Sequence, residues 1–381
     1  MSVRRPMGIE TELGLIEPGN PGANPLALAA HVVAAYAGSP GSATGTGDPV
    51  RWDYAGEDPL CDARGFRLDR AAAHASQLTD APTAPAPGGP QDSRPTAVRR
   101  PSAAEQALPT ALNVVLTNGA RLYVDHAHPE YCSPEVTTPL DAVRWDRAGE
   151  LVAQRAMHAL AQRPDLPDVV LYKNNVDGKG AAYGTHENYL VRREVNFGDI
   201  VRYLTPFFVT RPVFCGAGRV GLGQRSERPG FQISQRADYV ENDVGLETTF
   251  NRPIVNTRDE PHADADRWRR LHVIGGDATG MDVSTYLRVG TTSLVLWLLE
   301  QGAVPMELDA LMLADPVAET WAVSHDPTLT HRLTLADGRE MTALQLQRTY
   351  LDVVADALRE AGGTAPETRD VVERWAGVLD R

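Results

Sequence analysis

The sequence predicts an α+β fold in which a mostly antiparallel, curved β-sheet forms a cradle and helices pack on its convex face. Two observations lead to this prediction. Short segments at 7–13 and 113–125 alternate apolar and polar side chains with a period of two, which is typical of strands with one buried face. Longer apolar segments with helix start and stop signals, such as 26–36 and 284–299, separate the strands. Antiparallel sheets commonly have one polar face and one face covered by helices.

The first strand, 7–13, presents two carboxylates on one face. Side chains of a strand alternate at about 3.3 Å per residue, so Glu10 and Glu12 lie roughly 7 Å apart. Gly8 and Gly14 leave room beside them. The alternate residues point into the core: Met7, Ile9, Thr11 and Leu13. Taken alone, two glutamates on an edge strand are more often a solvated face.

A second acidic strand follows a hairpin turn. Asn118-Gly119 is the strongest short hairpin signal, and it separates 114–117 from 120–125. Alternation then places Arg121, Tyr123 and Asp125 on one face over roughly 13 Å. A strand of this kind is usually a ladder of cross-strand salt bridges. Its convergence with the first acidic strand favours a functional site instead.

The other elements follow from caps, stops and alternation. Asn24-Pro25 begins a helix that runs to Tyr36 and stops at Gly38, and Asp141 caps a helix through about Gln162. The remaining strands are predicted over 169–173, 230–238 and 253–256, and the remaining helices from near 263, over 284–299 and over 367–379. The strand at 230–238 places three polar residues on one face: Gln232, Ser234 and Arg236. The helix from near 263 carries Arg269, Arg270 and His272.

Residues His262, Asp264 and Asp266 allow two interpretations. Their spacing could form a metal motif. Acidic residues are also favoured in the first turn of a helix, because they complement its dipole. We prefer the helix interpretation.

An inserted flexible loop is predicted over 37–112. Residues 37–50 are rich in Gly, Ser and Thr, and residues 81–110 contain seven prolines with few apolar residues. Between them, 51–80 has a denser polar and aromatic pattern that includes RWDYAGEDPLCDARGF. A long loop of this kind is usually either disordered or a lid over a site.

Composition excludes several classes of protein. A formal net charge of −13 argues against nucleic acid as a partner, because phosphate binding needs a basic surface. The 381 residues contain three widely spaced cysteines, Cys61, Cys132 and Cys215, which fit neither a disulfide framework nor a zinc site. The chain lacks the apolar segment of a signal peptide or a membrane span. We therefore expect a cytoplasmic, membrane-free protein and, since nothing suggests an obligate assembly, a monomer.

Carboxylates and arginines on one sheet face favour a magnesium–nucleotide site. Carboxylates that converge repel one another unless cations lie between them, and Mg²⁺ prefers carboxylate and phosphate oxygens. The planar guanidinium groups of Arg121, Arg236 and Arg258 match phosphate oxygens. The P-loop and Rossmann glycine motifs are both missing. His186 and His272, taken singly, are more often structural histidines than ligands.

Together these segments resemble the Dop/PafA family, the enzymes of bacterial pupylation, whose fold is related to glutamine synthetase and other carboxylate–amine ligases. The matching stretches span residues 7 to about 330 and include MGIETE, NGARLYVDHAHPEYCSPE, YKNNVDGKG, YGTHENYL, LTPFFVTR, GAGRVG, FQISQRADY and RPIVNTRDEPHADADRWRRLHVI. The Dop branch fits better than the ligase branch. The insert resembles the loop that marks Dop, and the spacing from Asp125 to Glu130 has one residue fewer than in the ligases.

The resemblance implies hydrolysis of a side-chain amide. Dop-branch enzymes deamidate the C-terminal glutamine of the small protein modifier Pup and cleave the isopeptide bond between Pup and substrate lysines. By resemblance, Asp125 is the catalytic residue, acting as nucleophile or as base. The metal positions are Glu10, Glu12, Tyr123 and Glu130, with His186 as a weaker candidate. Arg121 and Ser133 match nucleotide contacts, and Arg236, Arg258 and His272 match phosphate-handling positions. The implied cofactors are Mg²⁺ and ATP, or ADP plus phosphate, which build the site.

Two features depart from the family pattern. The proline-rich insert is longer than expected, and family members continue past position 381 into a small C-terminal domain. The prediction is therefore a single glutamine synthetase-like domain, 1–381, with the small domain absent or truncated. Three other interpretations of the protein remain open: a Pup ligase, an inactive Pup-binding homologue and, less well supported, a small-molecule γ-glutamyl ligase.

The segment 192–228 is basic, with seven arginines and three acidic residues. Pup is disordered and acidic, so we interpret this segment as part of its docking groove. Arg202 and Arg211 are predicted to contribute. The alternative interpretation is a set of ordinary solvated arginines.

Overall fold

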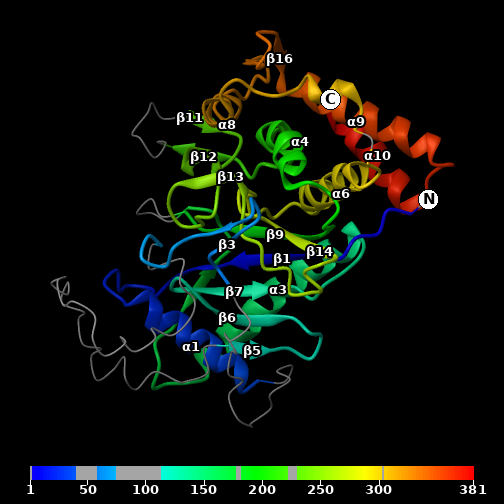
Figure 1. Ribbon diagram of the computed structural model, residues 1–381. Helices are drawn as coiled ribbons and strands as arrows, with labels where there is room; N and C mark the ends of the chain where they lie inside the picture. Colours follow the sequence, from blue (N-terminus) through cyan, green and yellow to red (C-terminus); the bar gives the residue numbers. More distant parts are fainter. Residues whose placement is uncertain (1, 40–57, 74–112, 177–181, 222–229, 303) are drawn as a thin grey trace.

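The computed structural model describes residues 2–39, 58–73, 113–176, 182–221, 230–302 and 304–381. A six-stranded antiparallel sheet crosses the middle of the molecule in the order β14-β9-β1-β7-β6-β5 (Figure 1). Its strands are β1 (Met7–Glu12), β5 (Asn113–Val115), β6 (Arg121–Asp125), β7 (His128–Cys132), β9 (Thr185–Arg192) and β14 (Trp268–Val273). This sheet and the helices around it confirm the predicted α+β fold.

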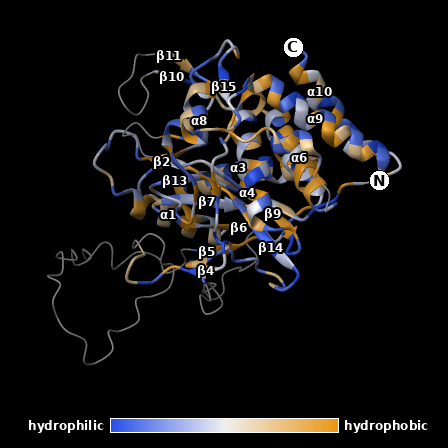
Figure 2. Ribbon diagram, turned by 45° about the horizontal axis from the view of Figure 1, so that its top comes forward, coloured by the Kyte–Doolittle hydropathy of each residue, from blue (hydrophilic) through white to orange (hydrophobic). Residues whose placement is uncertain are grey.

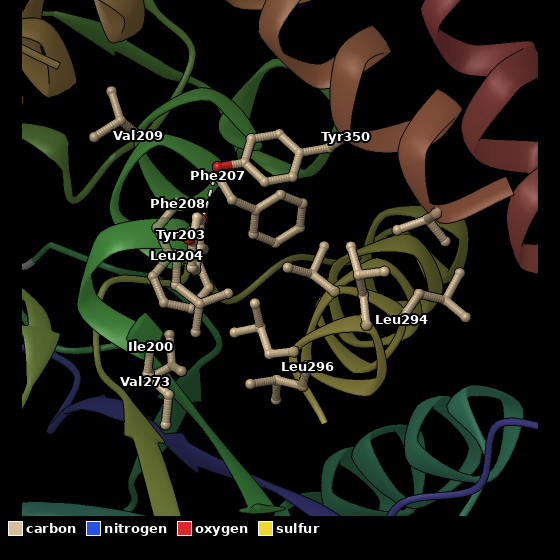
Figure 3. Close-up of a cluster of buried hydrophobic side chains, with 14 of the residues drawn as sticks. Ile200, Tyr203, Leu204, Phe207, Phe208, Val209, Val273, Leu294, Leu296 and Tyr350 are labelled. Carbon is tan, nitrogen blue, oxygen red and sulfur yellow. Dashed lines mark hydrogen bonds between the residues drawn. The ribbon is translucent and has the colours of Figure 1, made fainter. Parts of the chain in front are cut away.

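Helices cover one face of the sheet in two groups. Near β5, β6 and β7 lie α1 (Pro25–Ala37) and α3 (Pro139–Ala161), which share a small hydrophobic core with these strands. Near β9 and β14 the larger core contains α4 (Phe197–Thr210), α5 (Pro212–Cys215), α6 (Asp282–Leu299), α9 (Ala343–Glu360) and α10 (Pro366–Leu379). Figure 3 shows this core where α4, α6 and α9 meet. There Tyr350 packs on Phe207 and donates a hydrogen bond of 2.6 Å to the carbonyl of Tyr203.

The remaining elements are short. Four two-stranded ribbons pair β2 (Gly14–Ile16) with β8 (Val170–Tyr172), β3 (Cys61–Asp62) with β4 (Phe66–Arg67), β10 (Arg219–Gly221) with β11 (Gly230–Gln232), and β15 (Arg332–Thr334) with β16 (Glu340–Thr342). Strands β12 (Val240–Gly245) and β13 (Arg252–Asn256) run parallel. Two short helices, α7 (Met306–Asp309) and α8 (Pro316–Ser324), lie between α6 and β15 in the sequence. Figure 2 shows hydrophobic and hydrophilic residues on both α9 and α10, as expected for helices with one buried face.

Several predicted elements are confirmed by the structure. Asn24 caps α1, its side chain accepting hydrogen bonds from Leu26 N and Ala27 N, and the helix ends before Gly38. The hairpin of β5 and β6 turns at Asn118-Gly119, and α6 begins within two residues of the expected start.

All three cysteines are free thiols. Among the described helices, none combines the length and the apolar character that crossing a membrane requires.

The helix predicted from near residue 263 is wrong, because 268–273 forms strand β14. Leu271 and Val273 point into the larger core while Arg270 and His272 lie on the opposite face. The acidic residues at 264 and 266 precede this strand and do not lie in a helical turn. The acidic residues at 264 and 266 are typical of the first turn of a helix. The chain that follows, 268–273, is nevertheless a strand, because it pairs with β9.

Two smaller predictions also differ from the structure. Thr138, not Asp141, caps α3: its hydroxyl accepts the N–H of Asp141, and Pro139 occupies the first turn, where a proline is tolerated. The strand predicted over 230–238 continues only to Gln232. Beyond it the chain bends, since Asp277 holds the backbone N–H groups of Gln235 and Arg236.

Most of the predicted insert, 37–112, lies outside the described residues, including both stretches interpreted as loop except 37–39. Residues 58–73 are described and contain the β3–β4 hairpin. This hairpin is fixed to the segment after β13: Ala63 N donates to Thr257 O at 2.8 Å, and Asp259 N donates to Cys61 O at 3.0 Å. Buried Asp62 accepts the hydroxyl of Thr257 at 2.6 Å.

Candidate functional site

The sheet register brings the two predicted acidic strands together through β7, which lies between them. Glu12 of β1 is opposite Glu130 of β7, and Glu130 is opposite Tyr123 of β6. Glu10 is opposite Cys132 on one side and His186 of β9 on the other. Directly opposed residues point to the same face of an antiparallel sheet. The predicted metal positions therefore share one face.

Glu10 lies in a ring of nitrogen donors. Its carboxylate accepts Asn188 Nδ2 at 3.0 Å and contacts His186 Nδ1 at 3.3 Å, with Arg270 Nη1 at 3.9 Å. Burial alone would raise the pKa of Glu10, but the hydrogen bond from His186 and the charges of His272, His186 and Arg270 hold this pKa well below its usual range. Burial and the charge of Arg270 lower the pKa of His272 well below its usual value. The surrounding nitrogen donors thus favour the anionic form of Glu10.

Glu130 has the opposite electrostatic environment. It is 1% exposed and accepts Tyr123 Oη at 2.7 Å through Oε1, while Oε2 finds no partner in the described part of the chain. Burial, followed by the charges of Glu10, Asp125 and Glu12, raises the pKa of Glu130 well above its usual value. Burial also raises the pKa of Tyr123 and of Cys132. A buried carboxyl group among other carboxylates carries a proton or is neutralised by a cation.

The carboxylates of this face, those of Glu10, Glu12, Asp125 and Glu130, suit a hard divalent cation, whereas the neighbouring thiol and imidazole groups suit softer metals. Glu10, Glu130 and Cys132 offer ligand atoms within 4.8 Å of one another, as do Glu10, His186 and His272. A third group of the same kind consists of Glu12, Asp125 and His126. The unpartnered Oε2 of Glu130 provides a carboxylate oxygen for an ion. Tyr123 and Glu130 lie together as predicted, and His186 approaches Glu10 directly.

Asp125 lies at the end of β6, beside the turn into β7. Its Oδ2 is 2.8 Å from His126 Nδ1, and its side chain is 35% exposed, which leaves it accessible to a substrate. Glu12 is buried, and its Oε2 accepts Gly184 N at 2.9 Å. The side chains of Glu12, Asp125 and His126 therefore form one acidic corner of the sheet.

The predicted nucleotide residues occupy two regions. Arg121 donates to Asn113 Oδ1 at 3.1 Å and lies over the Tyr123 ring, at the far end of β6 from Asp125. Ser133 is bonded to the backbone, since its hydroxyl accepts Ile9 N at 2.9 Å and donates to Pro134 O. His272 contacts the ring of His186, and both histidines have a ligand atom within 4.8 Å of one of Glu10. Arg258 Nε lies 3.4 Å from Glu260 Oε2.

Arg236 is held beside the acidic corner by backbone carbonyls. It is 3% exposed, and its Nη1 donates to Thr185 O and Gly276 O at 3.2 Å each. Its Nε has no hydrogen-bond partner among the described residues, and burial lowers the pKa of its guanidinium. Asp277 fixes the backbone there by accepting the N–H of Arg236 at 3.2 Å. A buried cation of this kind suits an anionic ligand.

The sequence reasoning missed several residues of this face. Asn188 links Glu10 to Arg270 and His272, because its amide donates to the first and accepts from the other two. Arg252 donates to Ala182 O at 2.9 Å, and burial and the charge of Arg236 lower its pKa to about 10. Asn188 alternates with buried residues in β9, and this signal could have identified it.

The predicted role of Arg211 in docking is wrong. Arg211 is 3% exposed and forms two hydrogen bonds, of 2.7 and 3.0 Å, with fully buried Glu187. Other arginines of this segment pair with acidic residues: Arg193 with Asp259, Arg202 with Asp309 and Arg219 with Asp238. Arg225 and Arg228 lie outside the described residues. Four of the five arginines of this segment that the structure describes therefore have an acidic partner.

One face of the antiparallel sheet thus carries the carboxylates of Glu10 and Glu130 together with the guanidinium groups of Arg121 and Arg270. Residues 5–381 match the family described as Pup-ligase protein. The chain belongs to this family, which confirms the resemblance to the enzymes of pupylation.

Curated relatives are 50% identical to this chain over the aligned residues. The depupylase of Acidothermus cellulolyticus is 50% identical over 383 residues, covering 100% of this chain and 69% of that protein. The Pup deamidase/depupylase of Mycobacterium tuberculosis is 50% identical over 380 residues, covering 100% of this chain and 70% of that protein.

Two solved structures share the fold. The complex between the prokaryotic ubiquitin-like protein Pup and its ligase PafA gives a TM-score of 0.70 at 31% identity, covering 99% of this chain and 64% of the solved chain. PafA in complex with ADP gives 0.62 at 38% identity, covering 71% and 60%. The chain therefore spans less than two thirds of each solved chain, and the glutamine synthetase-like fold is confirmed.

Proposed function

We propose that this protein is a Pup deamidase and depupylase. It would hydrolyse the side-chain amide of the C-terminal glutamine of Pup and the isopeptide bond that joins Pup to substrate lysines. The observation that carries the proposal is the difference in similarity: relatives named depupylases are 50% identical over the whole chain, whereas the solved ligases are 31% and 38% identical. Pup and pupylated proteins are the proposed partners.

Asp125 is the proposed catalytic residue. Its partial exposure at the edge of a buried carboxylate face supports this role, since a substrate amide can approach it there. The carboxylate would attack the amide carbon itself or take a proton from an attacking water. Both routes end in a free γ-carboxyl group on Pup and a released amine. This amine is ammonia in deamidation and the side-chain amine of the substrate lysine in depupylation.

Mg²⁺ and a nucleotide are the proposed cofactors. Glu10, Glu12, Tyr123 and Glu130 would hold the metal, with His186 beside Glu10, and the unpartnered oxygen of Glu130 supports this assignment. Arg121 and Ser133 would contact the nucleotide, and Arg236, Arg258 and His272 would contact phosphate oxygens. When bound, Mg²⁺ would supply positive charge that stabilises the oxyanion of the reacting amide.

The test is incubation of the purified chain with Pup ending in glutamine, Mg²⁺ and ATP, followed by mass spectrometry and ammonia detection. We expect the amide to be replaced by a carboxylic acid, with release of ammonia. A ligase would leave this Pup unchanged and would instead join Pup ending in glutamate to a lysine. Binding of Pup without ammonia release would identify an inactive homologue.

The first prediction concerns Asp125. We expect Asp125→Asn to reduce hydrolysis below detection, because the amide is neither a nucleophile nor a base, while Pup binding stays within about twofold. Turnover is measured by ammonia release and binding by titration of labelled Pup. The exposed Asp380→Asn serves as a control with full activity. Retained turnover in Asp125→Asn would refute the assignment.

A further inference from the structure

The turn between β6 and β7 has an unfavourable sequence for its conformation. It contains only two residues, His126 and Ala127, and both have positive φ angles, 43° and 72°. A two-residue hairpin turn of this type strongly prefers Asn-Gly or Asp-Gly, because other residues are strained there. At the neighbouring hairpin of the same chain, a glycine, Gly119, takes the positive φ of 85°. A histidine that breaks this local rule beside the proposed catalytic residue indicates a requirement other than folding.

The turn places the imidazole of His126 beside the proposed catalytic carboxylate. Nδ1 of His126 lies 2.8 Å from Asp125 Oδ2, and the side chains are 43% and 35% exposed. With Nδ1 occupied by Asp125, Nε2 is the ring nitrogen left to meet a substrate. The hydrogen bond that His126 donates to Asp125 raises the pKa of His126, and the charges of Asp125 and Glu12 reinforce this shift. Burial and the charge of Arg252 oppose it. In its imidazolium form His126 donates from Nδ1 to Asp125 and carries a second proton on Nε2.

We propose that His126 is the proton donor to the leaving nitrogen in the amide hydrolysis proposed above. The inference rests on that proposed function. As a C–O bond forms to the amide carbon and the C–N bond breaks, the Nε2 proton of His126 moves to the departing nitrogen. The products are the γ-carboxyl group and a neutral amine.

The proton balance closes on either route to the products. When water attacks, Asp125 takes one water proton while His126 gives one, and the pair returns to its starting charge by proton exchange through its hydrogen bond or with solvent. When Asp125 attacks, the same His126 proton leaves with the amine, and water then cleaves the mixed anhydride. Protonation matters because an unprotonated amide anion is a very poor leaving group.

The test replaces His126 by the residue that the turn itself prefers. Asn tolerates positive φ and can donate a hydrogen bond to Asp125, but it has no proton to transfer. We expect His126→Asn to keep or raise the midpoint of thermal unfolding and to lower kcat for a lysine isopeptide by about 100-fold or more. A purely structural role for His126 would predict no loss of kcat in a variant that is at least as stable.

A second substrate separates proton donation from other roles. In a Pup aryl γ-ester the leaving phenolate needs no proton, so His126→Asn should retain its kcat for the ester within about tenfold. Equal losses on isopeptide and ester would overturn the inference, as would unchanged kcat on both. A change confined to the Mg²⁺ concentration needed for activity would also overturn it, and would identify His126 as a metal ligand.

Two matched controls complete the experiment. Ala127→Gly relaxes the same turn without touching the imidazole, and His158→Asn makes the same substitution on an exposed position of α3. Both should keep the wild-type ratio of isopeptide to ester cleavage. Failure of the wild-type chain to cleave either substrate would contradict the proposed function, whereas a His126→Asn variant that matches an active wild type contradicts only this inference.

Discussion

Glu130 is a buried carboxyl group, and both its burial and the neighbouring carboxylates oppose its ionisation. It is 1% exposed, and the carboxylates of Glu10, Glu12 and Asp125 all raise its pKa. A carboxyl group whose pKa is higher in the folded than in the unfolded protein destabilises the fold increasingly as pH rises from the unfolded value toward the folded one. At a pH above the unfolded pKa this buried carboxyl group therefore weakens the metal-free fold, and a bound cation would reverse this effect.

We expect Glu130→Gln to raise the thermal midpoint of the protein without divalent cations, since the amide keeps the acceptor for Tyr123 and removes the charge. The same variant should bind Mg²⁺ at least about 10-fold more weakly, a loss that is found even for partners of metal ligands. Both are measured by thermal unfolding across a Mg²⁺ titration. Exposed Glu135→Gln is the control. Equal stabilisation of Glu130→Gln and wild type by Mg²⁺ would remove Glu130 from the metal site.

At the scale of elements, the segment that enters β9 positions the acidic corner. Ala182 O binds Arg252, Gly184 N binds Glu12, and Thr185 O binds Arg236. Gly184 has φ +152°, and a Cβ there would lie 2.6 Å from Asn175 Oδ1. Asn175 cannot move aside easily, because both ends of its amide are bonded to the backbone of Ala278.

Gly184→Ala should therefore cost about 2 kcal/mol of unfolding free energy, in the range for strained backbone positions. It should also lower hydrolysis, since the new Cβ lies 3.1 Å from Arg236 Nη1. Urea unfolding and ammonia release measure the two effects. Gly377→Ala provides the comparison, because open space surrounds that helical glycine and alanine is favoured there. A Gly184→Ala variant as stable and active as wild type would show that this segment adapts freely.

At the scale of the whole molecule, a buried ion cluster joins the sheet to the helices. Glu187 of β9 is fully buried and binds Arg211, between α4 and α5, and Arg288 of α6 lies 3.6 Å away. Arg288 also bonds the carbonyl of Asp277, which fixes the loop that holds Arg236. Glu187 thus links the sheet and the loop that holds Arg236 to the larger core.

Arg211→Met should cost about 3–5 kcal/mol, because it leaves a buried carboxylate without its main partner. Burial would raise the pKa of Glu187, but Arg211 and Arg288 lower it below its ordinary value of 4.5. The stability that this carboxylate contributes is present above pH 4.5 and is lost as pH falls through the folded pKa. The destabilisation of Arg211→Met should therefore shrink in acid. Urea unfolding at several pH values checks this, with exposed Arg359→Met expected to stay within about 0.5 kcal/mol. A pH-independent difference would contradict it.

The sequence by itself determined which side chains of β1 and β6 share a face, because strand alternation depends only on neighbouring residues. It also determined the Asn24 cap, the Asn118-Gly119 turn and, through long matching segments, the family. It could not place β7 between the acidic strands, or distinguish exposed Arg202 from buried Arg211, whose partner lies 24 residues away. Strand β14 was missed because its conformation comes from pairing with β9. Tertiary structure decided these features because burial, pairing and charge compensation depend on residues that are distant in the chain and adjacent only in the fold.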